Sequence, residues 1–142
     1  HMIGKLQTNK VKYAVPLFDY IHSVDSEKLA KKIADEQKKI NKKIKIFLQV
    51  NIGNENQKSG IDKNNLMSLV SYSKEIGLDL VGLMCIPPLN IDPEDYFEEI
   101  DKINKALGFA ELSMGMSSDF LKAAKHSSTY IRVGSKIFGQ RS

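Results

Sequence analysis

The feature that most constrains the fold of this chain is an alternation of short, continuous apolar segments with longer amphipathic segments. Residues 44–52 (IKIFLQVNI) are rich in β-branched side chains, which is typical of a buried strand. The amphipathic segments repeat their apolar residues with a helical period, as helices that pack on a sheet do. Buried strands that alternate with such helices predict a parallel sheet covered by helices.

The pattern predicts six strands separated by helices. The strands are expected at residues 2–4, 18–24, 44–52, 78–86, 111–116 and 129–133. Helices are expected to begin near residues 25, 62, 92 and 118, with Asp25 or Ser26 capping the first and Asp62 the second. The chain has no linker, low-complexity tract or internal repeat beyond the alternation, so residues 1–142 are expected to form a single domain.

Composition narrows the class of partner. The formal net charge is +4, but 19 of the 21 cationic residues are lysines mixed with acidic residues, so we expect no nucleic-acid partner. No apolar run approaches the length of a membrane span, and the first residues lack a secretory signal pattern. Cys85 is the single cysteine, and its apolar neighbours predict a packed thiol. These features predict a cytoplasmic protein that has no membrane partner.

Two apolar segments near the end of the chain stop at small residues with free backbone N–H groups. The first ends at Gly115, Met116 and Ser117, and the second ends at Gly134 and Ser135. Glycine allows close approach to a ligand, while serine hydroxyls and a helix start after Ser117 would add hydrogen-bond donors. Each residue alone fits a helix cap or a strand end. At consecutive strand ends of a parallel barrel, however, they predict a phosphate pocket.

Arg132 is one of only two arginines in a chain that otherwise uses lysine. It lies within an apolar strand, two residues before Gly134, so both positions face the same side of the strand. We therefore expect its guanidinium to reach a ring or carbonyl group beside the bound phosphate. A buried ion pair with a core carboxylate is the alternative.

The sequence also lacks the Gly-x-Gly-x-x-Gly turn of a dinucleotide site, a Walker loop and a metal-ligand spacing.

Together these segments resemble the pyridoxal 5′-phosphate homeostasis protein family, the single-domain relatives of the alanine racemase barrel. The matching segments are residues 1–10 (HMIGKLQTNK), 21–25 (IHSVD), 50–60 (VNIGNENQKSG), 82–87 (GLMCIP), 112–119 (LSMGMSSD) and 131–139 (IRVGSKIFG). They follow one another in order along the whole chain. One mild departure is Ser127-Ser-Thr, where the family usually has Gly-Ser-Thr.

The resemblance implies a (β/α)8 barrel of the alanine racemase N-terminal type, with pyridoxal phosphate (PLP) at its C-terminal mouth. By analogy, Ser117 and the Gly134–Ser135 segment would hold the phosphate, and Gly115 and Met116 would line the site. Arg132 would face the pyridine nitrogen and keep it unprotonated, which weakens the ring as an electron sink. This suits a non-catalytic carrier or regulator in vitamin B6 homeostasis better than an enzyme.

The departure from the family pattern at the N-terminal end of the chain is larger. In the family, an opening helix and two βα units precede the segment that matches His1, and the first of those strands carries the lysine that binds PLP as an imine. The present chain would therefore be a truncated barrel of about six strands, equivalent to strands three to eight. The phosphate pocket would then take PLP, inorganic phosphate or sulfate.

Truncation would leave two strand edges open. A second copy of the chain, as a homodimer, or the missing N-terminal segment would cover them. Two other functions stay open. One is a remnant with only a structural or interaction role. The other is a racemase-like enzyme on a phosphate-bearing ligand, with His22, Asp25 and Asn51 as acid–base candidates.

Overall fold

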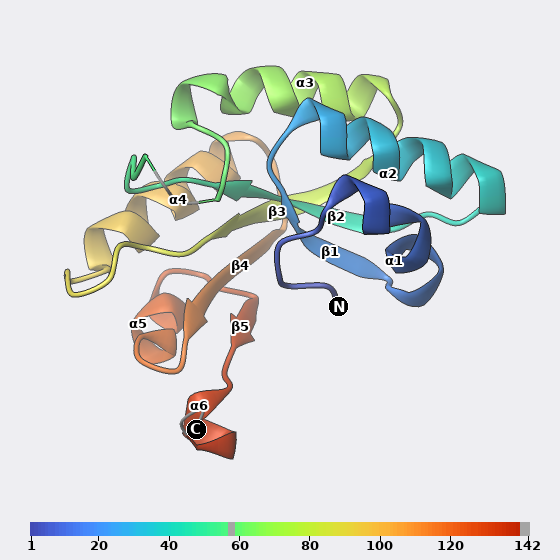
Figure 1. Cartoon of the computed structure of the whole chain (residues 1–142). Coiled ribbons are helices and arrows are strands. Elements are labelled where there is room, and N and C mark those ends of the chain that lie inside the picture. Colours follow the sequence, from blue (N-terminus) through green and yellow to red (C-terminus); the bar gives the residue numbers. More distant parts are fainter. Residues whose placement is uncertain (57–58, 140–142) are drawn as a thin grey trace.

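The computed structural model describes residues 1–56 and 59–139 and contains one parallel sheet, shown in Figure 1. Its five strands are β1 (Tyr20–Val24), β2 (Lys45–Val50), β3 (Asp79–Cys85), β4 (Glu111–Met116) and β5 (Tyr130–Arg132). They lie in the sheet in the same order as in the chain, and each pair of neighbours is parallel. A doubly wound sheet would reverse its order at a switch point. The order therefore confirms the truncated barrel and not the open sheet.

Most of the helices lie on the outer side of the sheet, while the short helix at the end of the described chain projects beyond β5 (Figure 1). The helices are α1 (Val11–Leu17), α2 (Glu27–Ile40), α3 (Leu66–Glu75), α4 (Glu94–Ala106), α5 (Phe120–Lys125) and α6 (Ser135–Phe138), with 3-10 turns η1 (Thr8–Lys10) and η2 (Lys63–Asn65). The Ser26 hydroxyl accepts a hydrogen bond from the Leu29 N–H, 3.2 Å away, and caps α2 as one of the two predicted caps. Asp62 caps η2, which leads directly into α3.

The strand expected at residues 2–4 is the main error in the predicted elements. Only Met2 pairs with β1, in a parallel bridge to Ile21. Its N–H donates to the Tyr20 carbonyl at 2.8 Å, and its carbonyl accepts from the His22 N–H at 2.9 Å. One bridged residue is too little for a strand, so the sheet has five strands, and Met2 adds a single bridge at β1. The helix α1 was also not predicted, because Pro16 lies within its seven residues.

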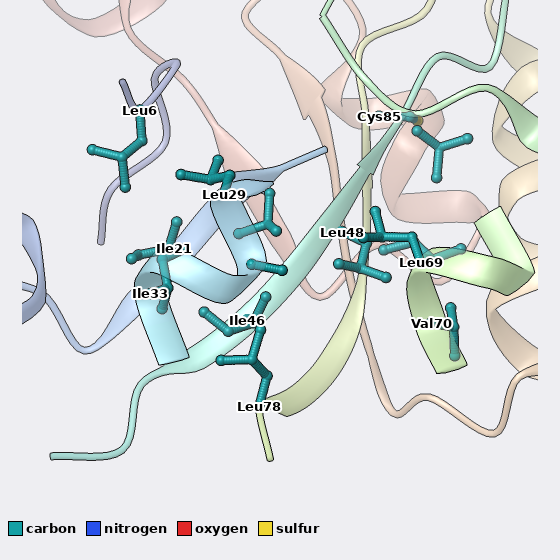
Figure 2. Close-up of a cluster of buried hydrophobic side chains, with 14 of the residues drawn as sticks. Leu6, Ile21, Leu29, Ile33, Ile46, Leu48, Leu69, Val70, Leu78 and Cys85 are labelled. Atoms are coloured by element: carbon teal, nitrogen blue, oxygen red, sulfur yellow. The ribbon is translucent and has the colours of Figure 1, made fainter. Parts of the chain in front are cut away.

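The main core lies between the sheet and the outer helices (Figure 2). Ile21, Ile46 and Leu48 from the strands pack against Leu29 and Ile33 of α2 and against α3. Cys85 is fully buried, and this burial raises the pKa of its thiol to about 12. The prediction of a packed thiol is confirmed.

Aromatic rings cover the inner face of the sheet. His22 of β1 stacks on Phe47 of β2, with ring centroids 4.3 Å apart. Tyr20 of β1 and Tyr130 of β5 also meet, at 5.7 Å, although they belong to the first and last strands of the sheet. The sheet therefore curves until its two outer strands touch through their side chains, as a half-barrel does.

Asn104 of α4 connects two strands through its buried side chain. Its Oδ1 accepts from the Leu83 N–H at 2.9 Å, and its Nδ2 donates to the Glu111 carbonyl at 3.0 Å. We expect Asn104→Ala to lower the free energy of unfolding by about 3 kcal/mol, because the Leu83 N–H and the carbonyls of Phe109 and Glu111 all lose their partner. Urea denaturation measures the loss, with the exposed Asn64→Ala as control. Equal stability of the two variants would contradict the role of Asn104.

Candidate functional site

The two predicted strand ends lie side by side because β4 and β5 are neighbours in the sheet. Met116, the last residue of β4, is in register with Arg132, the last residue of β5. The Ser117 hydroxyl then accepts hydrogen bonds from the backbone N–H groups of Gly134, at 3.1 Å, and Lys136, at 3.3 Å. Two N–H groups from the second strand end thus converge on one oxygen atom from the first. The Gly134 N–H is therefore paired with Ser117, whereas the sequence analysis expected it to be free. A phosphate oxygen accepts hydrogen bonds from the same type of donor pair.

Gly115 adopts a positive φ of 96°, which explains the need for glycine. A Cβ atom at this position would lie 2.7 Å from the Ala123 Cβ and 3.0 Å from the Phe120 Cα. The space next to Gly115 is therefore filled by α5, and this glycine allows α5 to pack against β4. Its predicted contact with a ligand stays a prediction.

Met116 and its neighbours form the turn that leads into α5. The Met116 N–H donates to Asp119 Oδ1 at 2.6 Å, and its side chain is exposed. Sequence analysis did not single out Asp119, although a carboxylate three residues after a strand end is a common turn signal. The helix α5 begins at Phe120, two residues after the predicted start at residue 118.

Arg132 lies on the inner side of β4 and β5 with its guanidinium largely buried. Its Nη1 donates to Ser113 Oγ at 2.7 Å and its Nη2 to the Cys85 carbonyl at 3.0 Å. Both acceptors are neutral, so these contacts differ from the ion pair with a core carboxylate that was the alternative. Burial lowers the pKa of Arg132, and the guanidinium stays charged because its ordinary pKa is so high.

His22 lies next to this arginine site and is almost completely buried. Its Nδ1 lies 2.8 Å from Ser113 Oγ, and its Nε2 lies 3.0 Å from His1 Nδ1. Burial, with a further contribution from the positive charge of Arg132, lowers the pKa of His22 to about 4. The imidazole is therefore neutral at physiological pH. Ser113 was missed by the sequence analysis; a hydroxyl between Leu112 and Met114 in an apolar strand was the available signal.

The other two acid–base candidates hold a loop together. Asp25 Oδ2 accepts from the Gly60 N–H at 3.2 Å. Asn51 donates to the Glu55 carbonyl at 2.8 Å and accepts from the Glu55 N–H at 3.2 Å. These bonds fasten the segment after β2, so the structure places Asp25 and Asn51 in structural contacts rather than beside His22.

Hydroxyl, guanidinium and backbone N–H donors lie together at the carboxyl ends of the strands of this half-barrel. This arrangement is that of the alanine racemase barrel class. The family model described as "Alanine racemase, N-terminal domain" matches residues 2–142. The pyridoxal phosphate homeostasis proteins of Aquifex aeolicus and Synechocystis are 38% and 36% identical to this chain, each over 99% of it. The chain belongs to this family of pyridoxal phosphate homeostasis proteins.

A solved structure supports the same assignment. PipY of Synechococcus elongatus, determined with PLP bound, is 34% identical and superposes with a TM-score of 0.89, over 96% of this chain and 68% of PipY. The chain spans 66% of the Aquifex protein and 69% of the Synechocystis protein. Within the described residues, no helix has both the length and the apolar character needed to cross a membrane.

Proposed function

We propose that this chain is a PLP-binding domain, formed by residues 1–142, of a protein that acts in vitamin B6 homeostasis in the cytoplasm without catalysing a reaction. The observation that carries the proposal is the convergence of the Gly134 and Lys136 N–H groups on the Ser117 hydroxyl. The names of the relatives and the PLP recorded in PipY support the choice of ligand.

The residues present fit a phosphate dianion. In the proposed complex a phosphate oxygen replaces Ser117 Oγ as the acceptor of the Gly134 N–H. The Ser135 N–H donates to the phosphate as well, and the Ser117 hydroxyl turns to donate to it. Gly134 has open space where a Cβ would stand, so a ligand can approach its backbone. Hydrogen bonds to a charged oxygen are worth about 1.5–3 kcal/mol each, so a few of them hold the anion without a lysine. Gly115 and Met116 complete the proposed site.

Arg132 argues for a carrier over an enzyme. In the proposal its guanidinium faces the ring nitrogen of PLP from the inner side of β5. PLP, when bound, supplies a pyridine ring that can act as an electron sink. A guanidinium donates hydrogen bonds but does not release a proton, so it leaves the ring nitrogen unprotonated. The chain's own groups therefore bind and orient the ligand without promoting carbanion chemistry.

The outer edges of β1 and β5 also enter the proposal. We infer that a further polypeptide segment, such as the third of the relatives outside the match, or a second copy of the chain covers these edges. Sedimentation of the chain alone distinguishes the two, because a homodimer doubles the mass.

Calorimetric titration with inorganic phosphate and with PLP tests the proposed site. We expect the chain to bind both, and we expect Ser117→Ala to weaken both by about tenfold, because one hydrogen bond to a charged oxygen is lost. Ser71→Ala, which removes an exposed serine hydroxyl on α3, is the control and should bind as the wild type does. A chain that binds neither ligand would overturn the proposal and favour the structural or interaction role.

A further inference from the structure

A continuous line of hydrogen bonds crosses the inner face of the half-barrel from Arg132 to His1. Arg132 Nη1 contacts Ser113 Oγ at 2.7 Å, Ser113 Oγ contacts His22 Nδ1 at 2.8 Å, and His22 Nε2 contacts His1 Nδ1 at 3.0 Å. Ser113 and His22 are both almost fully buried. The line therefore joins β5, β4 and β1 across the inner face of the half-barrel.

The donor and acceptor inventory gives this line a direction. Arginine can only donate, so Ser113 Oγ accepts from Arg132 and has its own proton free to donate. A neutral His22 accepts that proton's hydrogen bond at Nδ1 and donates from Nε2 to His1. A protonated His22 would instead present an N–H at Nδ1 and leave the Ser113 hydroxyl proton without this acceptor. In the proposed arrangement the neutral form of His22, with its proton on Nε2, uses the Ser113 hydroxyl proton as well as both ring nitrogens.

Resting on the proposed function, we propose that Ser113 and His22 are positioning residues that orient the Arg132 guanidinium toward the ring of the bound ligand. Ser113 holds Nη1, and the Cys85 carbonyl at the end of β3 holds Nη2. The plane of the guanidinium is fixed by two acceptors from two different strands. In the proposal the N–H groups that remain donate to the ligand, and their direction follows from that plane.

The geometry also explains why the acceptor is a hydroxyl. A carboxylate at position 113 would pair with Arg132 and neutralise the charge offered to the ligand. An alanine would leave Nη1 buried without this partner and free to turn. Serine, held in turn by His22, fixes the guanidinium and leaves its full charge in place.

Titration of two ligands separates positioning from general stability. We expect Ser113→Ala to weaken PLP binding by about tenfold and to leave inorganic phosphate binding unchanged, because phosphate alone does not reach Arg132. In an Arg132→Met background the same substitution should have no further effect on PLP binding. Ser23→Ala and Ser73→Ala are matched controls, since both remove a buried hydroxyl that has no hydrogen-bond partner among the described residues.

A second measurement does not depend on any ligand. Nitrogen NMR of the His22 ring should show a neutral imidazole with its proton on Nε2, and Ser113→Ala should shift the Nδ1 resonance. A proton on Nδ1, or a loss of phosphate and PLP binding to the same extent in Ser113→Ala, would overturn the inference. If the wild type binds neither ligand, both the proposed function and the ligand-facing role of Arg132 are wrong. The NMR measurement on the His22 ring then still shows whether the hydrogen-bond line exists.

Discussion

Gly82→Ala is expected to prevent stable folding, with a loss of about 4 kcal/mol or more in the free energy of unfolding. Gly82 lies in β3, in register with Phe47 of β2 and Glu111 of β4. A Cβ atom would overlap the Glu111 carbonyl oxygen and lie 3.0 Å from the Phe47 ring. Backbone atoms of a central strand cannot move aside without breaking the pairing of β3 with β4.

Thermal and urea denaturation measure this effect. Gly4→Ala is the matched control, since a Cβ atom at Gly4 meets nothing within 4 Å, and it should unfold close to the wild type. The consequence extends to the site, because β3 carries the Cys85 carbonyl and β4 carries Ser113, the two acceptors of Arg132. A Gly82→Ala protein as stable as the Gly4→Ala protein would show that the sheet relaxes more easily than its backbone contacts indicate.

Local patterns were enough to predict most of the elements. A continuous apolar run such as residues 44–52 is a strong strand signal, and it became β2 with its ends trimmed. Ser26 was predicted as a helix cap because a cap needs only its own side chain and the next few N–H groups. Adjacency of the two strand ends followed from the barrel, since strands that are consecutive in the chain are neighbours in the sheet.

What could not be predicted depends on curvature and on contacts between distant strands. Nothing local shows that residues 2–4 make one bridge rather than a strand, or that Tyr20 meets Tyr130 across the sheet. The partners of Arg132 are another case, because Ser113 and Cys85 come from strands far away in the sequence. The alternation of side chains along β5 predicts the side of the sheet on which Arg132 lies. It does not predict which hydrogen-bond acceptors the guanidinium contacts there.

Acid should destabilise this protein through His22. The ordinary pKa of histidine is 6.5, and burial and the charge of Arg132 lower the pKa of His22 to about 4. The charged groups around its ring are Arg132 and the amino terminus, and His1, Tyr20 and Tyr130 are its titratable ring neighbours. Below pH 6.5 His22 becomes protonated in the unfolded chain but stays neutral in the folded chain until the pH approaches 4. Stability is therefore full above this pH, falls as the pH drops toward 4 and levels off below it.

Between pH 7 and pH 5 this difference amounts to about 2 kcal/mol of unfolding free energy. Lysine partners lower the pKa of Glu36, Asp92 and Glu98, so these carboxylates lose their stabilising effect only at lower pH than this window. We expect His22→Gln to be less stable than the wild type at pH 7 but to lose most of the slope between pH 7 and pH 5. His126→Gln, which removes a half-buried histidine beside Glu94, is the comparison variant outside the His22 hydrogen-bond line. An unchanged slope in His22→Gln would mean that the folded chain protonates His22 as readily as the unfolded chain does, and it would contradict the proposed hydrogen bond from Ser113 to a neutral ring.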